Sequence, residues 1–382
     1  MPLQKLALKP GVNRENTRYT SEGGWYESDK IRFRQGTPEK IGGWQRISDA
    51  TFLGVCRSLW NWVTLGSQNL IGVGTNLKFY IENGGAYNDI TPLRNTVSLT
   101  DPFTTTNGSP TVSVVDANGG YISGDFVTFS GASAVGGLTL NGEYQITVDT
   151  TASNTYFITA SSNATSTATG GGTVSAAYQI NTGAAYVIPL TGWGAGSWGA
   201  GVWGTGGTSD TEIRLWSQAN FGEDLLFGPR GGPIYYWDAT SGLTSRGVLL
   251  SSVSPATANV PTVQDVILVS DISRFVFCFG CNALASGTKN PMLIRWSDQE
   301  DSTQWTPAAT NQAGSLQLSR GTEIVAAKQA RQEVLVWSDS ALYALQYVGA
   351  PVVWGAQLVG ENISIASQNA VAYANGVAYW MG

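Results

Sequence analysis

The apolar residues of this chain fall into short runs that are closed by turn residues, and four such runs recur together as a unit. The clearest unit consists of EIRLWSQAN (212–220), DLLFG (224–228), PIYYWDA (233–239) and SRGVLL (245–250). Short segments rich in β-branched and aromatic residues, bounded by Gly, Pro, Asn or Asp, are typical of β-strands. The pattern therefore predicts four consecutive strands in this stretch.

Three further stretches repeat this arrangement, and a partial fifth unit, ISIASQNAVAYANGVAYWMG, starts at residue 363. The predicted strands are 54–64, 69–75, 78–84 and 87–93; 263–273, 274–280, 291–298 and 302–308; and 321–331, 333–339, 341–349 and 351–359. Unit starts at 212, 263, 321 and 363 are spaced by roughly the 40 to 50 residues of a β-propeller blade. The fold class is therefore all-β. A β-propeller is favoured over a β-sandwich, because a sandwich does not require similar four-strand units in succession.

The two ends of the chain supply half a blade each. The fifth unit holds two strands, and KIRFRQG (30–36) with EKIGGWQRI (39–47) reads as the two that would complete it. Pairing them would remove open sheet edges that otherwise invite aggregation. We therefore predict about five four-stranded blades, the last shared between N- and C-terminal strands. Residues 1–29 form an N-terminal arm, 30–97 the closing strands and first blade, and 212–382 the remaining blades.

The composition changes in the middle of the chain, where no Lys or Arg occurs between Arg94 and Arg214. Residues 98–180 alternate polar and apolar positions, with turn dipeptides at Asn118-Gly119 and Asn141-Gly142. This pattern predicts a small β-sandwich or barrel, inserted in the loop between the first two blades, where added residues cost little free energy.

A Gly/Trp-rich loop follows at 181–211, and three tryptophans recur in it every five residues, at Trp193, Trp198 and Trp203. Two interpretations stay open. The tryptophans either anchor the loop on the propeller or form a candidate subunit interface, where Trp is a common contributor to binding energy. The GxGxxG match in this loop lacks the flanking strand and helix of a dinucleotide site.

The charge of the chain limits its partners. The net charge is −6 and the sequence pI is about 4.8, whereas a surface that grips nucleic acid is basic. No apolar run approaches the roughly 18 residues of a membrane span. The N-terminal MPLQKLALKPG also lacks the apolar core of a signal peptide.

Residues suited to catalysis are scarce. The chain has no histidine, which removes Ser–His and Cys–His nucleophiles and the commonest metal ligand. Asp298, Glu300 and Asp301 lie in one turn, where capping of backbone amides is favoured over the separated carboxylate pair of a glycosidase.

The three cysteines are Cys56, Cys278 and Cys281. The last two form a CFGC sequence, which we interpret as buried thiols, because no second pair or histidine completes a zinc site. The sequence thus predicts no catalytic, cofactor-binding or metal-binding residues, and a protein that is not an enzyme.

Long blocks of the chain resemble one known family. GGWQR (42–46), IRWSDQE (294–300) and QYVGAPVVWG (346–355) are similar to the packaged-DNA stabilisation proteins, or tail hub and nozzle proteins, of short-tailed bacteriophages. The resemblance covers most of the chain outside the insertion. Members of that family continue past a block like YWMG, which implies further C-terminal sequence.

The resemblance implies a structural component of the virion tail, assembled in the host cytoplasm and without a cofactor. It implies a homohexameric ring below the portal and adaptor that retains packaged DNA and conducts it outward without binding it specifically. Tail fibre or needle proteins would be further partners, and the inserted domain would meet fibres or the host envelope. The alternative is a glycan-binding or glycan-cleaving propeller, such as a receptor-binding spike or a sialidase-like protein. That protein would need arginines and acids at the propeller axis.

Overall fold

The computed structural model describes residues 9–15, 17, 19–20, 23–43, 48–186, 213–256 and 259–382. The chain divides into two compact units, Met1–Asp49 and Ala50–Gly382. In the described residues, strands dominate, and the helices are the 3-10 turns η1 (Ala239–Ser241) and η2 (Leu250–Ser252). The predicted all-β class is confirmed.

Among its described residues, the first unit contains one hairpin, the N-terminal hairpin, of β1 (Ile31–Arg34) and β2 (Thr37–Lys40). Gln35 and Gly36 have φ of 50° and 81°, as a tight two-residue hairpin turn requires. Phe33 of β1 lies edge-on to Trp25, with ring centroids 6.0 Å apart.

In the described residues of the second unit, four antiparallel sheets are each built from four strands that follow one another in the sequence. The first sheet is β3 (Cys56–Val63), β4 (Asn69–Thr75), β5 (Phe79–Asn83) and β6 (Ala86–Asp89). The second is β16 (Trp216–Phe221), β17 (Asp224–Pro229), β18 (Tyr235–Trp237) and β19 (Val248–Leu249). The third is β20 (Val266–Val269), β21 (Val276–Phe279), β22 (Leu293–Trp296) and β23 (Gly314–Gln317). The fourth is β24 (Ile324–Gln329), β25 (Glu333–Ser338), β26 (Ala341–Gly349) and β27 (Val353–Glu361). The predicted units of four consecutive strands are confirmed.

One predicted strand is wrong. Residues 302–308 form a loop, and the fourth strand of the third sheet is β23. Trp305 in this loop is buried at 1% exposure, and its Nε1 donates to the carbonyl oxygen of Ser302 at 2.8 Å. The apolar residue that suggested a strand therefore fills the core from a turn.

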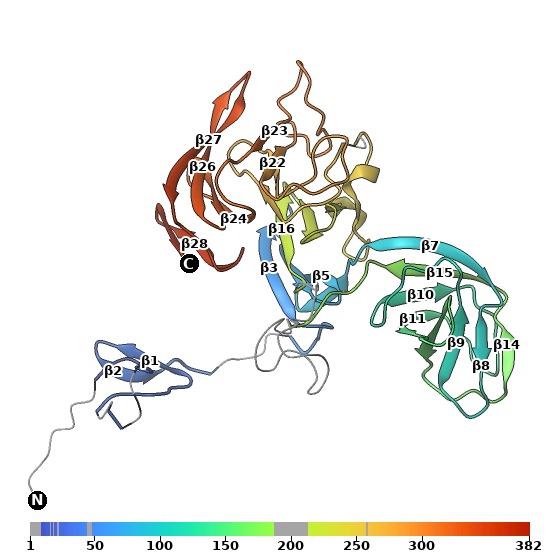
Figure 1. Cartoon of the computed structure of the whole chain (residues 1–382). Helices are drawn as coiled ribbons and strands as arrows, with labels where there is room; N and C mark the ends of the chain where they lie inside the picture. Colours follow the sequence, from blue (N-terminus) through green and yellow to red (C-terminus); the bar gives the residue numbers. More distant parts are fainter. Residues whose placement is uncertain are drawn as a thin grey trace, which may run out of the picture. The chain divides into compact units, whose positions relative to one another are not determined.

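Adjacent sheets pack face to face, because the strands present alternate residues to opposite faces. On β17, Leu225 and Phe227 pack against the first sheet, whereas Leu226 packs against the third. A further core joins the third and fourth sheets. A smaller one joins the fourth sheet to the C-terminal hairpin, formed by β28 (Val371–Ala374) and β29 (Val377–Trp380). The units thus stack as a series of five (Figure 1).

The shared closing blade stays a prediction. β1 pairs with β2 and β28 pairs with β29, and each pair is a separate two-stranded sheet. Asn375 and Gly376 form the tight turn of the C-terminal hairpin, with φ of 52° and 82°. Both hairpins are therefore specified by local turns, whereas joining them needs contact between residues far apart in the sequence.

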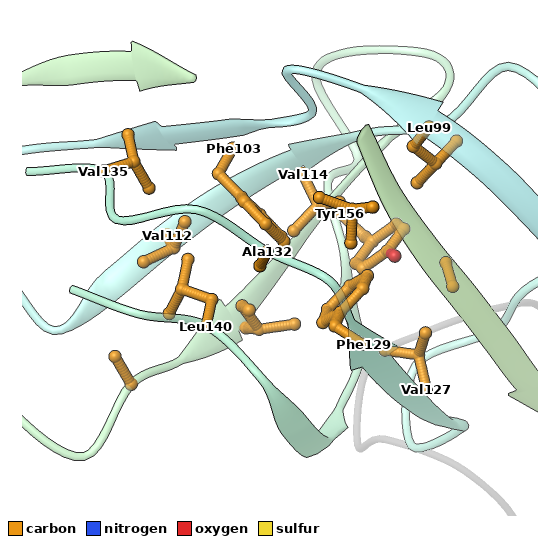
Figure 2. Close-up of a cluster of buried hydrophobic side chains, with 14 of the residues drawn as sticks. Leu99, Phe103, Val112, Val114, Val127, Phe129, Ala132, Val135, Leu140 and Tyr156 are labelled. Atoms are coloured by element: carbon orange, nitrogen blue, oxygen red, sulfur yellow. The ribbon is translucent and has the colours of Figure 1, made fainter. Parts of the chain in front are cut away.

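A β-sandwich lies between the first and second sheets in the sequence. One sheet has the order β11-β10-β15-β7 and the other β12-β13-β9-β8-β14. The strands are β7 (Leu93–Thr100), β8 (Phe103–Thr105), β9 (Thr111–Val115), β10 (Phe126–Ser130), β11 (Gly142–Gln145), β12 (Thr147–Val148), β13 (Thr155–Thr159), β14 (Ala168–Gly170) and β15 (Thr173–Gln179). Both sheets contribute to one core (Figure 2). In this core the rings of Phe103 and Phe129 pack edge to face, with their centroids 5.0 Å apart.

Candidate functional site

The first strands of the five stacked units lie next to one another in the order β3, β16, β20, β24 and β28, so that each contacts the next. The segment before β28 bridges back to the start of this series. Gln368 donates through Nε2 to the carbonyl oxygen of Trp216 on β16 at 3.1 Å, and Asn369 donates to that of Arg57 on β3 at 3.4 Å. These two bonds link the last unit to the first two, so the five first strands surround a common centre.

That centre holds a cavity of about 580 Å³, which we call the central cavity. All five units contribute to its wall, through Cys56–Trp60, Trp216–Ala219, Val266–Val269, Ala327–Gln329 and Val371, with Asp271, Gln368 and Asn369. Leu59 in this wall is 67% exposed, so the cavity opens to solvent.

The wall of the central cavity carries two cations and one carboxylate. Arg57 comes from β3, Lys328 from β24, and Asp271 follows β20. Arg57 and Lys328 are half-buried, and neither forms an ion pair with a residue in the described part of the chain. The cavity therefore concentrates positive charge in a chain whose net charge is −6.

Amide side chains supply most of the remaining polar groups of the wall. Gln218 donates through Nε2 to Ser58 Oγ at 3.0 Å and to the carbonyl oxygen of Gly72 at 3.3 Å. Gln329 donates to the carbonyl oxygen of Ala330 at 2.7 Å. Because the second and fourth sheets hold these amides in place, the wall is a fixed polar surface.

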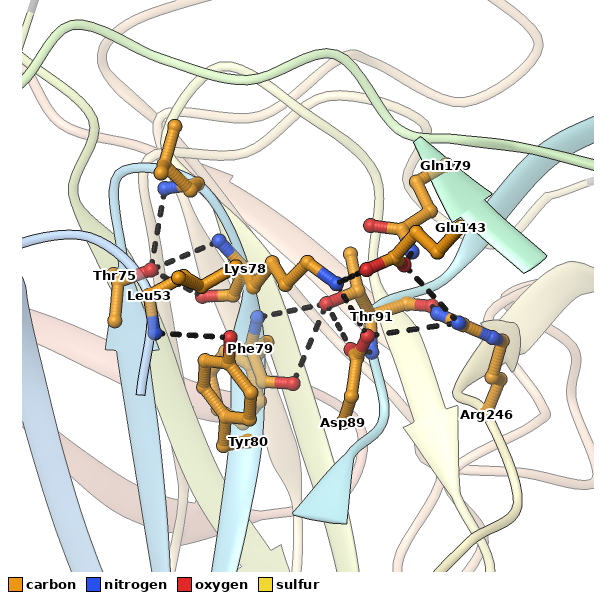
Figure 3. A network of polar contacts seen from close by, with 11 residues as sticks. Leu53, Thr75, Lys78, Phe79, Tyr80, Asp89, Thr91, Glu143, Gln179 and Arg246 are labelled. Carbon is orange, nitrogen blue, oxygen red and sulfur yellow. Dashed lines mark hydrogen bonds and ion pairs between the residues drawn. The ribbon is translucent and has the colours of Figure 1, made fainter. Parts of the chain in front are cut away.

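A second cluster of charges joins the sandwich to the first two sheets, and we call it the junction network (Figure 3). Lys78 is 3% exposed, and its Nζ donates to Asp89 Oδ2 at 2.8 Å and to Glu143 Oε2 at 2.5 Å. Glu143 belongs to the sandwich strand β11, and its Oε1 accepts from Gln179 Nε2 at 2.5 Å. The Lys78 ammonium also lies 4.6 Å from the centroid of the Phe126 ring, a cation–π contact.

Arg246, in the segment between η1 and β19, completes the network. Its Nη1 donates to the carbonyl oxygen of Thr91 at 2.8 Å, and its Nη2 lies 3.5 Å from Asp89 Oδ2. Burial disfavours the charged form of Asp89, but the positive charges of Arg246 and Lys78 outweigh it and lower the pKa of Asp89. The network therefore holds an ionised carboxylate at the base of the sandwich.

The three tryptophans of the candidate subunit interface, Trp193, Trp198 and Trp203, lie outside the described residues. The predicted capping role of the acidic turn is confirmed. Asp298 Oδ1 accepts from the amides of Gln299 and Gln312, both at 2.8 Å, and Asp301 caps the amide of Thr303 at 2.8 Å.

The predicted burial of the CFGC thiols is also confirmed. Cys278 and Cys281 are both 0% exposed. Burial raises the pKa of Cys281 to about 12 and that of Cys278 well above its ordinary value. Arg295 beside them is 2% exposed and donates to backbone carbonyls of Asn259, Asn282 and Trp305.

These thiols are expected to resist alkylation in the folded protein, because the thiolate is the reactive form and burial disfavours it. Cys56 is half-buried, so at neutral pH we expect it to react first with iodoacetamide. Mass spectrometry of peptides labelled before and after denaturation measures this order. Labelling of Cys278 or Cys281 in the folded protein at a rate similar to that of Cys56 would contradict it.

Within the described residues, no cluster of three or more His, Cys, Asp or Glu side chains is placed to hold a metal ion. In the same part of the chain, no helix has the length and hydropathy needed to cross a bilayer.

The comparisons with known proteins give a weak likeness among solved structures. No family model matches the chain, and no curated protein matches it. Among solved structures, the chain is similar to an endosialidase of phage phi92, with 13% sequence identity and a TM-score of 0.24. The match covers 90% of this chain and 55% of that protein, so the chain spans little more than half of its length. A TM-score this low identifies neither the fold nor the activity.

Sequence reasoning missed both charged clusters. Lys78 gave one usable signal, because a lysine directly before the apolar run FYI must be paired or carry its charge to solvent. Arg57 and Lys328 gave none, since they lie 271 positions apart in the printed sequence and line the same cavity only because of the order of the first strands.

Proposed function

We propose that this chain is a structural subunit of a short-tailed phage tail, the hub or nozzle ring that retains packaged DNA and conducts it outward. The observation that carries the proposal is the stack of five face-to-face units around a common centre, bearing a firmly attached sandwich. Such a stack is a stiff building block, suited to the wall of a conduit. The family resemblance of the blocks GGWQR, IRWSDQE and QYVGAPVVWG supplies the tail assignment.

The five units are, in this proposal, blades of a β-propeller. The fifth has two strands in the C-terminal hairpin, and two strands from the N-terminal region complete it. Two features support the propeller: the strands of each sheet pair in sequence order, and the first strands of successive sheets lie side by side. The blades of a β-propeller, which are four-stranded sheets repeated around an axis, share both features.

A conduit for DNA benefits from a surface that does not hold phosphate. The net charge of −6 and the absence of Lys and Arg between Arg94 and Arg214 support passage without specific binding. Apart from the start of β7, which contains Arg94, the sandwich lies within this cation-free stretch, and we assign it to contact with fibres or the host envelope. Tails lacking residues 98–180 are expected to lose fibres or adsorption, and unchanged particles would remove this assignment.

Hydrolysis of a glycan is not favoured by the central cavity. Most glycoside hydrolases use two carboxyl groups about 5 to 10 Å apart across the bond that breaks, although sialidases replace the nucleophilic carboxylate by a tyrosine. The described wall of the cavity offers one carboxylate, Asp271.

The mass of the purified assembly tests the proposed ring. We expect mass photometry to find six copies of the 40.4 kDa chain per particle. Three copies would favour a receptor-binding spike, and a monomer at every concentration would refute the ring.

Replacing Trp193, Trp198 and Trp203 together by Ser is expected to shift the particles toward monomers if these residues form the interface. An unchanged mass distribution would leave the anchoring interpretation.

A further inference from the structure

The central cavity is not needed for a structural role, and its charges call for an explanation. Arg57 lies on β3 of the first sheet and Lys328 on β24 of the fourth sheet. These two sheets are not neighbours in the stack, yet both residues line one cavity. Two other half-buried cations of the second unit are paired: Lys289 with Asp265 at 2.6 Å, and Arg246 with Asp89 at 3.5 Å. Arg94 and Arg214 are half-buried without an ion pair among the described residues, but neither lines the central cavity. Like charges in one partly desolvated space repel, so an uncompensated pair costs folding free energy.

From this arrangement we infer that the central cavity binds an acidic saccharide. The carboxylate of the sugar neutralises Arg57 and Lys328, which form no ion pair with a described residue; Asp271 is the one carboxylate of the described wall and leaves the cavity with a net positive charge. A concave wall with a low dielectric constant strengthens this attraction relative to an exposed patch. The volume of about 580 Å³ lies within the range of small-molecule sites, roughly 300 to 1,000 Å³.

The rest of the wall favours a sugar over a simple anion. Four amide side chains line the cavity, Gln218, Gln329, Gln368 and Asn369. Gln218 and Gln329 give both of their amide N–H donors to protein oxygens and are fixed parts of the wall. Gln368 and Asn369 each give one N–H to a backbone carbonyl, so each keeps a second N–H that can donate to a sugar hydroxyl. Trp60 adds an aromatic ring whose orientation is fixed, because its Nε1 donates to Asn220 Oδ1 at 3.1 Å. Apolar ring faces of this kind pack against the C–H face of a pyranose.

This inference is independent of the proposed tail ring, since it concerns one chain and a soluble ligand. The test is calorimetry on the full chain with N-acetylneuraminic acid and digalacturonic acid, each compared with its methyl ester. The acids are expected to bind with a millimolar Kd or tighter, and the neutral esters at least about tenfold more weakly. Binding of the acids is also expected to weaken at high salt, because screening reduces the attraction between charges.

A matched pair of variants locates the site. The double variant Arg57→Gln/Lys328→Gln removes both cavity cations and is expected to weaken acid binding at least about tenfold. Arg34→Gln/Lys40→Gln removes two exposed cations from the N-terminal hairpin and is expected to leave binding unchanged. The ester and salt measurements use the unmodified protein, so they decide the question even if the cavity variant does not fold.

Four results overturn the inference. They are absence of acid binding at millimolar concentration, equal binding of acid and ester, equal binding by the cavity variant in its folded form, and inorganic phosphate binding as tightly as the acidic sugars. The last result assigns the cavity to simple anions.

Discussion

Replacing Lys78 by Met is expected to lower the free energy of unfolding by about 3 kcal/mol, because it leaves Asp89 and Glu143 facing each other without the ammonium between them. Removing one partner of a buried ion pair typically costs about 3 to 5 kcal/mol. The lower end applies here, since Asp89 and Glu143 keep 23% and 32% exposure and Arg246 stays close to both. Urea denaturation followed by tryptophan fluorescence measures the change.

The matched control is Arg32→Met, which breaks the exposed pair of Arg32 with Glu39 on the N-terminal hairpin. Exposed pairs contribute about 0 to 1 kcal/mol, so this variant is expected to unfold almost as the unmodified protein does. Equal losses for the two variants would contradict the role assigned to the junction network.

The junction network also predicts a pH dependence of the stability. The pKa of Asp89 is lower in the folded chain than the roughly 3.9 of an unfolded aspartate. The stabilisation from this group is therefore complete above about pH 4 and is lost as the pH falls through the lower, folded value. The difference in Tm between Lys78→Met and the unmodified protein is expected to narrow below about pH 4. A constant difference down to pH 3 would show that the loss comes from packing alone.

The strands of the four stacked four-stranded sheets could be predicted because turn residues mark their ends. The four expected segments 321–331, 333–339, 341–349 and 351–359 correspond to β24, β25, β26 and β27 with small shifts at their ends. Periodicity is reliable here, since each strand is short, apolar and joined to the next by a local turn.

Prediction failed where tertiary contacts decide the conformation. The fourth strand of the third sheet, β23, begins at Gly314, a residue that alone signals no strand. A Cβ at this position would lie 2.5 Å from Trp296 Cζ2, so glycine lets the indole ring of β22 pack flat against β23. The candidate site was missed for a related reason, because Arg57 and Lys328 are brought together by the order of five sheets and by no local pattern.

Gly74 on β4 marks a close approach of the first two sheets, and Gly74→Ala is expected to destabilise the protein by about 3 kcal/mol. A Cβ at this position would lie 2.6 Å from Trp216 Cδ1 and 2.5 Å from Ser58 Oγ. Trp216 cannot move away, because it is 2% exposed, packs edge-on against Phe79 at 4.9 Å, and donates to the carbonyl oxygen of Thr75 at 2.6 Å. Overpacking of a filled core costs about 1 to 3 kcal/mol, and a rigid indole places this site at the upper end.

Gly66→Ala provides the control, since its Cβ would meet nothing closer than Thr64 Oγ1 at 3.7 Å. That substitution is expected to change the urea midpoint little. A double-mutant cycle with Trp216→Leu separates the clash from other effects of the methyl group. If the indole is the obstacle, Gly74→Ala costs much less in the Trp216→Leu background than in the unmodified protein, and the two changes are strongly non-additive. Additive losses would mean that the two sheets tolerate a side chain between them. The close approach of β4 and β16, which places Gln218 in the wall of the central cavity, would then not depend on glycine.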